Sequence, residues 1–280
     1  MCAPGCIEHV RQRLARDGID RRSFFRRAGA GAVGGTVLGM AGSLPAFAQE
    51  GRSFSRVVDL THPLGPSFPT FSGQPGVRLE RVNSLDTDGY NLFRWIIDEH
   101  TGTHMDAPMH FANGVASADQ LEIGNLVVPL AVVDIRAKAD GDPDAQLTPD
   151  DLSAWESEHG ELPENACVAM WSGWDAHVAT PTFRGADAQG GLHFPGFHPE
   201  ATSFLMDERQ IAAIAVDTLS LDYGASTDFA VHYSWLGSGR WGMECVANLG
   251  ELPATGAIFV AGHPKIEGST GGPSRVIALV

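Results

Sequence analysis

Basic residues are scarce in this sequence of 280 residues. Lys and Arg together number 19 against 34 Asp and Glu, which gives a formal net charge of −15 at pH 7. Because proteins bind a phosphate backbone through Lys and Arg, this balance argues against nucleic acid as a partner. The acidity is typical of a protein kept soluble by its charge, and an apolar content of 43% is ordinary for a globular chain.

Cysteine and long hydrophobic runs are also scarce. Cys2 and Cys6 lie near the start of the chain, and only Cys167 and Cys245 follow. The later pair could form one disulfide in an oxidising compartment or remain two buried thiols, and the sequence leaves both open. The apolar run 28–44 is rich in glycine and short for about 30 Å of hydrocarbon. We therefore expect no stable membrane anchor.

The beginning of the chain has the layout of an export signal. A stretch with seven Arg and three acidic residues precedes the run 28–44, and Pro-Ala-Phe-Ala at 45–48 offers small residues for cleavage. The segment DRRSFFR at 20–26 resembles the twin-arginine motif. We therefore expect residues 1–48 to be a twin-arginine signal peptide, and the mature chain 49–280 to be periplasmic or secreted. Removal of residues 1–48 would change the formal charge from −15 to about −19, because seven Arg and three acidic residues leave with the signal.

Strands dominate the secondary structure that the mature chain predicts. β-rich segments bounded by turn residues predict strands at 57–60, 95–97, 126–135, 166–170, 211–216, 256–260 and at the end of the tail 268–280. Helices are predicted at 148–159, where a Thr cap precedes Pro, and from 199 to 210. This interleaving predicts a single α/β domain with a mixed sheet.

One segment concentrates residue types that bind metal. Three of the eleven histidines and one aspartate fall within eleven residues, in the order His100, His104, Asp106 and His110. Imidazole nitrogen and carboxylate oxygen suit Zn²⁺ or Mn²⁺. A helix would leave Asp106 off the face of His100 and His104, and Pro108 disfavours helical angles just before it. In an extended chain all four side chains share one side. We therefore predict an extended or loop-like metal-binding segment, with unconnected surface or capping histidines as the alternative.

Spacing along the chain does not decide which further residues would complete this site. His232 and Glu244 are candidates in the second half of the chain. His193 and His198, each beside phenylalanine, are equally good candidates by the same criterion.

The segment His100–Phe111, HTGTHMDAPMHF, resembles the HxGTHxDxPxHF signature of the metal-dependent cyclase-like hydrolases, which include bacterial kynurenine formamidase and isatin hydrolase. Weaker similarities follow in the family's order along most of the mature chain, at 57–61, 69–73, 171–174, 216–222 and 268–278. The resemblance implies a swivelling β/β/α fold and assembly as a homodimer or homotetramer.

The resemblance also assigns roles to individual residues. His100, His104 and Asp106 would bind one or two divalent ions, Zn or Mn, and Asp106 could bridge two of them. His232 and Glu244 would complete the site. His110 would be the acid/base, and Phe71 would line the substrate pocket.

These roles imply hydrolysis of an amide or cyclic amide, such as an arylformamide or an isatin-like ring. Metal-activated water would attack, and His110 would move the proton. Phe71 and Trp174 could stack on an aromatic substrate, and core packing is the alternative for both. The sequence Phe71-Ser-Gly stands where formamidases often carry Trp-Pro-Gly, which argues against kynurenine formamidase itself. The alternatives are a lactone hydrolase or cyclase with the same site, and a non-catalytic periplasmic metal-binding protein.

Overall fold

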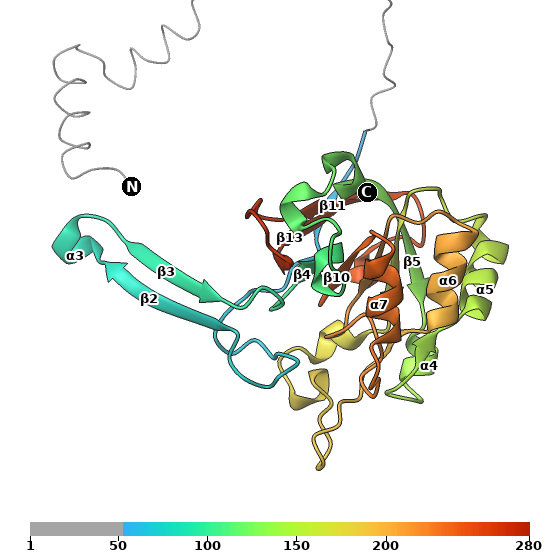
Figure 1. Cartoon of the computed structure of the whole chain (residues 1–280), viewed down its shortest axis with the longest axis horizontal. Coiled ribbons are helices and arrows are strands. Elements are labelled where there is room, and N and C mark those ends of the chain that lie inside the picture. Colours follow the sequence, from blue (N-terminus) through green and yellow to red (C-terminus); the bar gives the residue numbers. More distant parts are fainter. Residues whose placement is uncertain (1–52) are drawn as a thin grey trace, which may run out of the picture. The chain divides into compact units, whose positions relative to one another are not determined.

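The computed structural model describes residues 53–280, and the expected signal peptide lies outside these residues. A nine-stranded mixed sheet forms the centre of this part of the chain (Figure 1). Four neighbouring strands, β5, β7, β9 and β10, run parallel, and the outer strands join antiparallel. The strand order is β1 (Val57–Asp59), β13 (Arg275–Leu279), β11 (Ala257–Gly262), β5 (Val127–Asp134), β7 (Cys167–Trp171), β9 (Ala213–Val216), β10 (Trp241–Glu244), β4 (His104–Asp106) and β12 (Gly271–Pro273). The predicted α/β class with a mixed sheet is confirmed.

Successive side chains of each strand point to opposite faces of the sheet, and both faces are covered by apolar clusters. In β5, Leu130 and Val132 belong to one apolar cluster, whereas Ala131 and Val133 belong to another. The second cluster contains side chains of the three longest helices, which cover that face: α5 (Pro149–His159), α6 (Pro199–Asp207) and α7 (Ala230–Gly237). Shorter elements, α4 (Arg136–Ala139), β6 (Gln146–Leu147) and β8 (Gly196–Phe197), lie in the connections.

Local signals in the sequence explain the elements that were predicted. Helix α5 begins at Pro149 behind Thr148, which forms a capping box with Asp151. The predicted strands appear within a few residues of their expected bounds. Helix α7 and strands β2, β10 and β12 were not predicted, whereas β4 lies within the segment predicted to be extended. Cys167 and Cys245 are buried free thiols, so the disulfide alternative is wrong.

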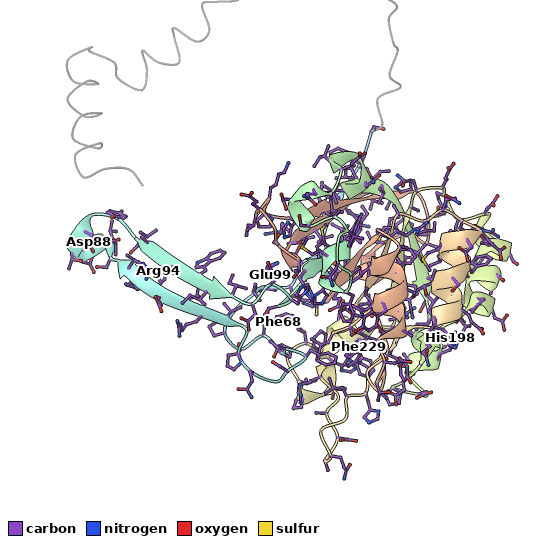
Figure 2. All side chains as sticks on the ribbon, in the orientation of Figure 1. Phe68, Asp88, Arg94, Glu99, His198 and Phe229 are labelled. Atoms are coloured by element: carbon purple, nitrogen blue, oxygen red, sulfur yellow. The ribbon has the colours of Figure 1, made fainter. Side chains whose placement is uncertain are left out.

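One hairpin forms a separate two-stranded sheet and extends away from the nine-stranded sheet (Figure 1). It consists of β2 (Val77–Asn83), the short helix α3 (Leu85–Asp88) and β3 (Leu92–Ile97), and we call residues 77–97 the hairpin arm. Figure 2 places Asp88 at its tip and Glu99 at its base, where the chain enters the histidine segment. Within residues 53–280, no helix is long and apolar enough to cross a membrane.

Candidate metal centre

The histidine segment is extended only in its middle. His104–Asp106 form β4, which lies between β10 and β12. Before it, Gly102 has φ +74°, and the space a side chain would need there is filled by Leu64. After it, Pro108–His110 form a 3₁₀ helix that begins with proline. The prediction of an extended or loop-like segment in place of a helix is therefore confirmed: β4 is extended, and a left-handed glycine and a proline turn the chain at its two ends.

The structure nevertheless brings the buried side chains of this segment together with two from elsewhere. Strand β10 places Glu244 directly opposite His104, and α7 supplies His232. His104 Nε2 lies 3.2 Å from Glu244 Oε2 and 3.3 Å from Asp106 Oδ1. His232 Nε2 lies 3.1 Å from Glu244 Oε1 and 3.5 Å from Asp106 Oδ2. Two imidazoles thus face two carboxylates.

The other histidines considered as candidates lie outside this cluster. His193 pairs with Asp144 at 2.7 Å, and His198 accepts a hydrogen bond at the start of α6. Spacing along the chain did not distinguish them from His232, whereas the pairing of β10 with β4 and the position of α7 do.

A hydrogen bond at Nδ1 orients each of the two buried imidazoles, His104 and His232. His104 Nδ1 donates to the Gly102 carbonyl at 2.8 Å, and His232 Nδ1 donates to Asp222 Oδ2 at 2.6 Å. Because each acceptor holds the proton on Nδ1, Nε2 is the nitrogen that faces the carboxylates and would bind a metal ion between them. Asp222 also accepts from the backbone amides of Val231 and His232 at 2.9 and 3.0 Å. This supporting residue was not singled out from the sequence.

The electrostatics of the cluster fit a divalent cation. Buried polar atoms normally form hydrogen bonds, yet His104 Nε2 and Asp106 Oδ2 form none among the residues described, although groups of opposite charge lie 3.2–3.5 Å from them. Burial lowers the pKa of His104, but Asp106 and Glu244 outweigh burial and raise that pKa to about 10. The negative charge that stabilises a proton on His104 would stabilise a metal ion instead, and the nitrogen and oxygen donors suit Zn²⁺ or Mn²⁺.

A second group shares Asp106 with the first. One ligand atom each of His100, Asp106 and His110 lie within 4.8 Å of one another, and the same holds for His104, Asp106 and Glu244. His100 Nδ1 is 2.6 Å from Asp106 Oδ1. On its other side, His100 Nε2 is 2.9 Å from Thr270 Oγ1, and the Thr270 hydroxyl donates to Glu99. Asp106 therefore stands where a carboxylate could bridge two ions.

His110 lies at the edge of this group. Its ring stacks on His100 with centroids 3.6 Å apart. Burial lowers the pKa of His110 to about 4, so the imidazole is neutral near pH 7. Within residues 53–280, no protein hydrogen bond holds the side chain of His110. A neutral imidazole that nothing else engages can accept a proton.

A cavity of about 190 Å³ opens onto the histidines. Phe71, Phe111 and Phe229 line it, and Phe71 is 40% exposed at the surface. The rings of Phe71 and Phe229 lie 5.9 Å apart, and those of Phe111 and Phe229 lie 5.7 Å apart. Of the two roles left open for Trp174, the structure shows core packing: Trp174 belongs to a buried apolar cluster, its indole donates to the Phe183 carbonyl, and it does not line this cavity.

A larger groove of about 1010 Å³ lies at the ends of β5 and β7. Its lining includes Arg136, Trp171 and Asp175, and it contains none of the clustered histidines. Size alone would favour this groove, but the chemistry that can bind a metal belongs to the smaller cavity.

Comparisons with known proteins identify the family of this chain. The family model of the Cyclase family, described as "Putative cyclase", matches residues 58–223. An isatin hydrolase of Roseibium aggregatum is 35% identical over 80% of this chain and 91% of its own length. A kynurenine formamidase of Salinibacter ruber is 25% identical over 79% of this chain and 96% of its own. The solved structure of isatin hydrolase A from Labrenzia aggregata, bound to benzyl benzoate, is 37% identical and covers 80% of this chain and 93% of that chain, with a TM-score of 0.76.

Proposed function

The chain belongs to the Cyclase family, and from this premise we propose that it hydrolyses the carbon–nitrogen bond of an amide or cyclic amide, of the isatin-like or arylformamide class. The observation that supports this most is the buried cluster of His104, Asp106, His232 and Glu244, whose unpartnered His104 Nε2 lies beside an aromatic-lined cavity. A relative named isatin hydrolase, 35% identical over most of both chains, supports the isatin-like ring.

The cluster would hold one or two Zn²⁺ or Mn²⁺ ions, with His100 joining the second group through Asp106. Such an ion polarises a carbonyl and lowers the pKa of water bound to it from about 15.7 towards 7. The protein contributes the fixed geometry, because Gly102 and Asp222 hold the two buried imidazoles in the ligating tautomer.

His110 is the acid/base of this proposal. It lines the cavity, it is neutral near pH 7, and its ring nitrogens are free of protein partners among residues 53–280. It accepts the proton of the attacking water and gives it to the leaving nitrogen, a role worth typically 10²–10⁴-fold in rate.

The walls of the cavity limit the substrate. A volume of about 190 Å³ lies below the roughly 300–1,000 Å³ of pockets for drug-sized ligands. Phe71, Phe111 and Phe229 offer ring faces and edges to a planar aromatic group. A small bicyclic or monocyclic aromatic amide fits both conditions.

The test is hydrolysis of isatin, N-formylkynurenine and a set of lactones by metal-depleted protein, with and without added Zn²⁺ or Mn²⁺. We expect metal-dependent turnover of an amide. Turnover of lactones alone would replace the proposal by the lactone alternative, and metal binding without turnover would make the chain a binding protein. His104→Ala should lose metal and activity, whereas His193→Ala, which changes a histidine paired with Asp144 outside the site, should keep both.

Two further parts of the proposal concern location and assembly. We propose export through the twin-arginine signal in residues 1–48, to the periplasm or the medium. Arg21→Lys with Arg22→Lys keeps the charge and should block export, so normal export of this double variant would refute it. We also propose that the protein is a homodimer or homotetramer.

A further inference from the structure

Asparagine is followed by glycine at one place in the sequence, Asn113-Gly114. In such a pair the backbone nitrogen of the glycine can reach the side-chain carbonyl carbon of the asparagine, because no Cβ stands in its way. The pair is therefore prone to close into a succinimide ring, provided that the fold leaves it free to do so. The other asparagines all precede Ser, Leu or Ala: Asn83, Asn91, Asn125, Asn165 and Asn248.

The fold leaves this pair exposed and without hydrogen bonds. Asn113 and Gly114 both lie at the surface, in the loop that follows the 3₁₀ helix Pro108–His110. Gly114 has φ +75°, and nothing lies within 4 Å of the position that a Cβ would take there. In the part of the chain that the structure describes, no hydrogen bond involves the side chain of Asn113 or the amide of Gly114. The side chains of Asn91 and Asn248, by contrast, form hydrogen bonds with the backbone.

The ends of this loop are fixed, and one of them belongs to the candidate active site. The Met109 amide donates to the Ala116 carbonyl at 3.1 Å, which closes the loop. Phe111, directly after His110, lines the cavity. Only residues 112–115 connect Phe111 to Ala116. A change in the length of the backbone at position 113 therefore acts on the wall of the cavity.

We propose that Asn113 is a site of spontaneous deamidation and isoaspartate formation in the folded protein. The Gly114 amide loses its proton to a base in the solvent, and its nitrogen bonds to Cγ of Asn113. The bond from Cγ to the side-chain nitrogen breaks, and ammonia leaves with a proton from water, so that a succinimide remains. Water then opens the ring. Cleavage between Cγ and the Gly114 nitrogen gives aspartate on an unchanged backbone. Cleavage at the backbone carbonyl gives isoaspartate, in which the main chain runs through Cγ and is one methylene longer.

The two products differ in their effect on the loop. Aspartate adds a negative charge but keeps the backbone, whereas isoaspartate changes the course of the chain between Phe111 and Ala116. We therefore expect turnover to fall as isoaspartate accumulates. Asn113→Asp, which adds the same charge on a normal backbone, should remain active when freshly purified. This consequence rests on the proposed function, but the modification itself does not.

The experiment follows the purified protein during incubation at mildly alkaline pH and physiological temperature. Peptides released by digestion at acidic pH are analysed by mass spectrometry with electron-transfer fragmentation, and isoaspartate is counted with protein isoaspartate methyltransferase. A side chain after the asparagine strains ring closure, so we expect Asn113 to convert about 10–100-fold faster than Asn125 and Asn165. Asn113→Gln keeps the amide but would have to close a larger ring, and it should remove the isoaspartate signal and keep its turnover through the same incubation.

A synthetic peptide of residues 107–119 separates the effect of the sequence from that of the fold. If this peptide converts and Asn113 of the folded protein does not, the fold protects the pair and the inference is overturned. Conversion of Asn113 no faster than that of Asn125 in the folded protein also overturns it. Unchanged turnover in protein that has accumulated isoaspartate overturns the effect on the cavity. Absence of turnover in fresh protein bears only on the proposed reaction, because the mass-spectrometric result does not depend on it.

Discussion

Replacing Asp222 by asparagine should weaken metal binding while leaving the fold in place. Asp222 Oδ2 accepts from both the ring and the amide of His232, and Oδ1 accepts from the Val231 amide. An asparagine of the same shape has one acceptor oxygen and one NH₂ group. In either orientation, the NH₂ group faces an N–H donor, either at Val231 or at His232.

The size of the effect follows from these contacts. If the amide oxygen faces His232, the hydrogen bond to its ring loses its ionic character. If the NH₂ group faces His232, the ring rotates or changes tautomer. Groups that orient a metal-bound histidine contribute about 10–100-fold to metal affinity, so we expect a loss in this range. The lost charge-assisted hydrogen bond should also lower stability by about 1–3 kcal/mol.

Asp228→Asn is the matched control. Asp228 Oδ1 accepts from the Ala230 amide at 3.3 Å at the same end of α7, but it does not contact His232. Zn²⁺ and Mn²⁺ affinities are measured by competition with a chromogenic chelator, and unfolding is measured with excess chelator present. The reasoning is refuted if Asp222→Asn binds metal as tightly as the wild type and Asp228→Asn.

Three more variants test other parts of the site and the fold. His110→Ala should keep its metal while turnover falls by roughly 10² or more; loss of metal would make His110 a ligand, and full activity would make it a bystander. Thr270→Val removes the hydroxyl between Glu99 and His100 and should weaken metal binding about tenfold, whereas Thr270→Ser should not; equal affinities would exclude this positioning role. Burial, opposed by hydrogen bonds from Ser172 and Trp174, raises the pKa of Asp217 to about 7. Since this folded-state pKa is above the unfolded value, its contribution to stability is present below about pH 4 and decreases towards pH 7, by as much as about 4 kcal/mol. Urea unfolding should show this decrease for the wild type and not for Asp217→Asn.

Much of the sheet could be predicted because its signals are local. Strands β5, β7 and β9 are short apolar runs, and helix α5 has a capping box within its first turn. In the hairpin arm, only its last three residues, 95–97, were predicted as a strand. Within residues 53–280, no segment covers Leu79, Phe93 and Trp95, which remain exposed, so the hairpin lacks the burial that gives most strands their apolar runs.

Helix α7 was missed for a different reason. It is only eight residues long, and Phe229 precedes it with φ +50° in place of a capping side chain. The cap comes from Asp222, which accepts the Val231 and His232 amides from outside the helix. A helix that starts through a tertiary contact has no sequence signal at its own beginning.

The metal centre shows the same division between local and tertiary information. His100, His104 and Asp106 are close in sequence, so composition and spacing could predict that their side chains lie together. Glu244 reaches them only because β10 pairs with β4 in a register that sets it opposite His104. Shifting that register by one residue would turn Glu244 to the other face of the sheet, and no spacing along the chain encodes the register. The role of Asp222 is equally hidden in the sequence. Asp222 can orient the ring of His232 only once α7 has brought the two side chains together.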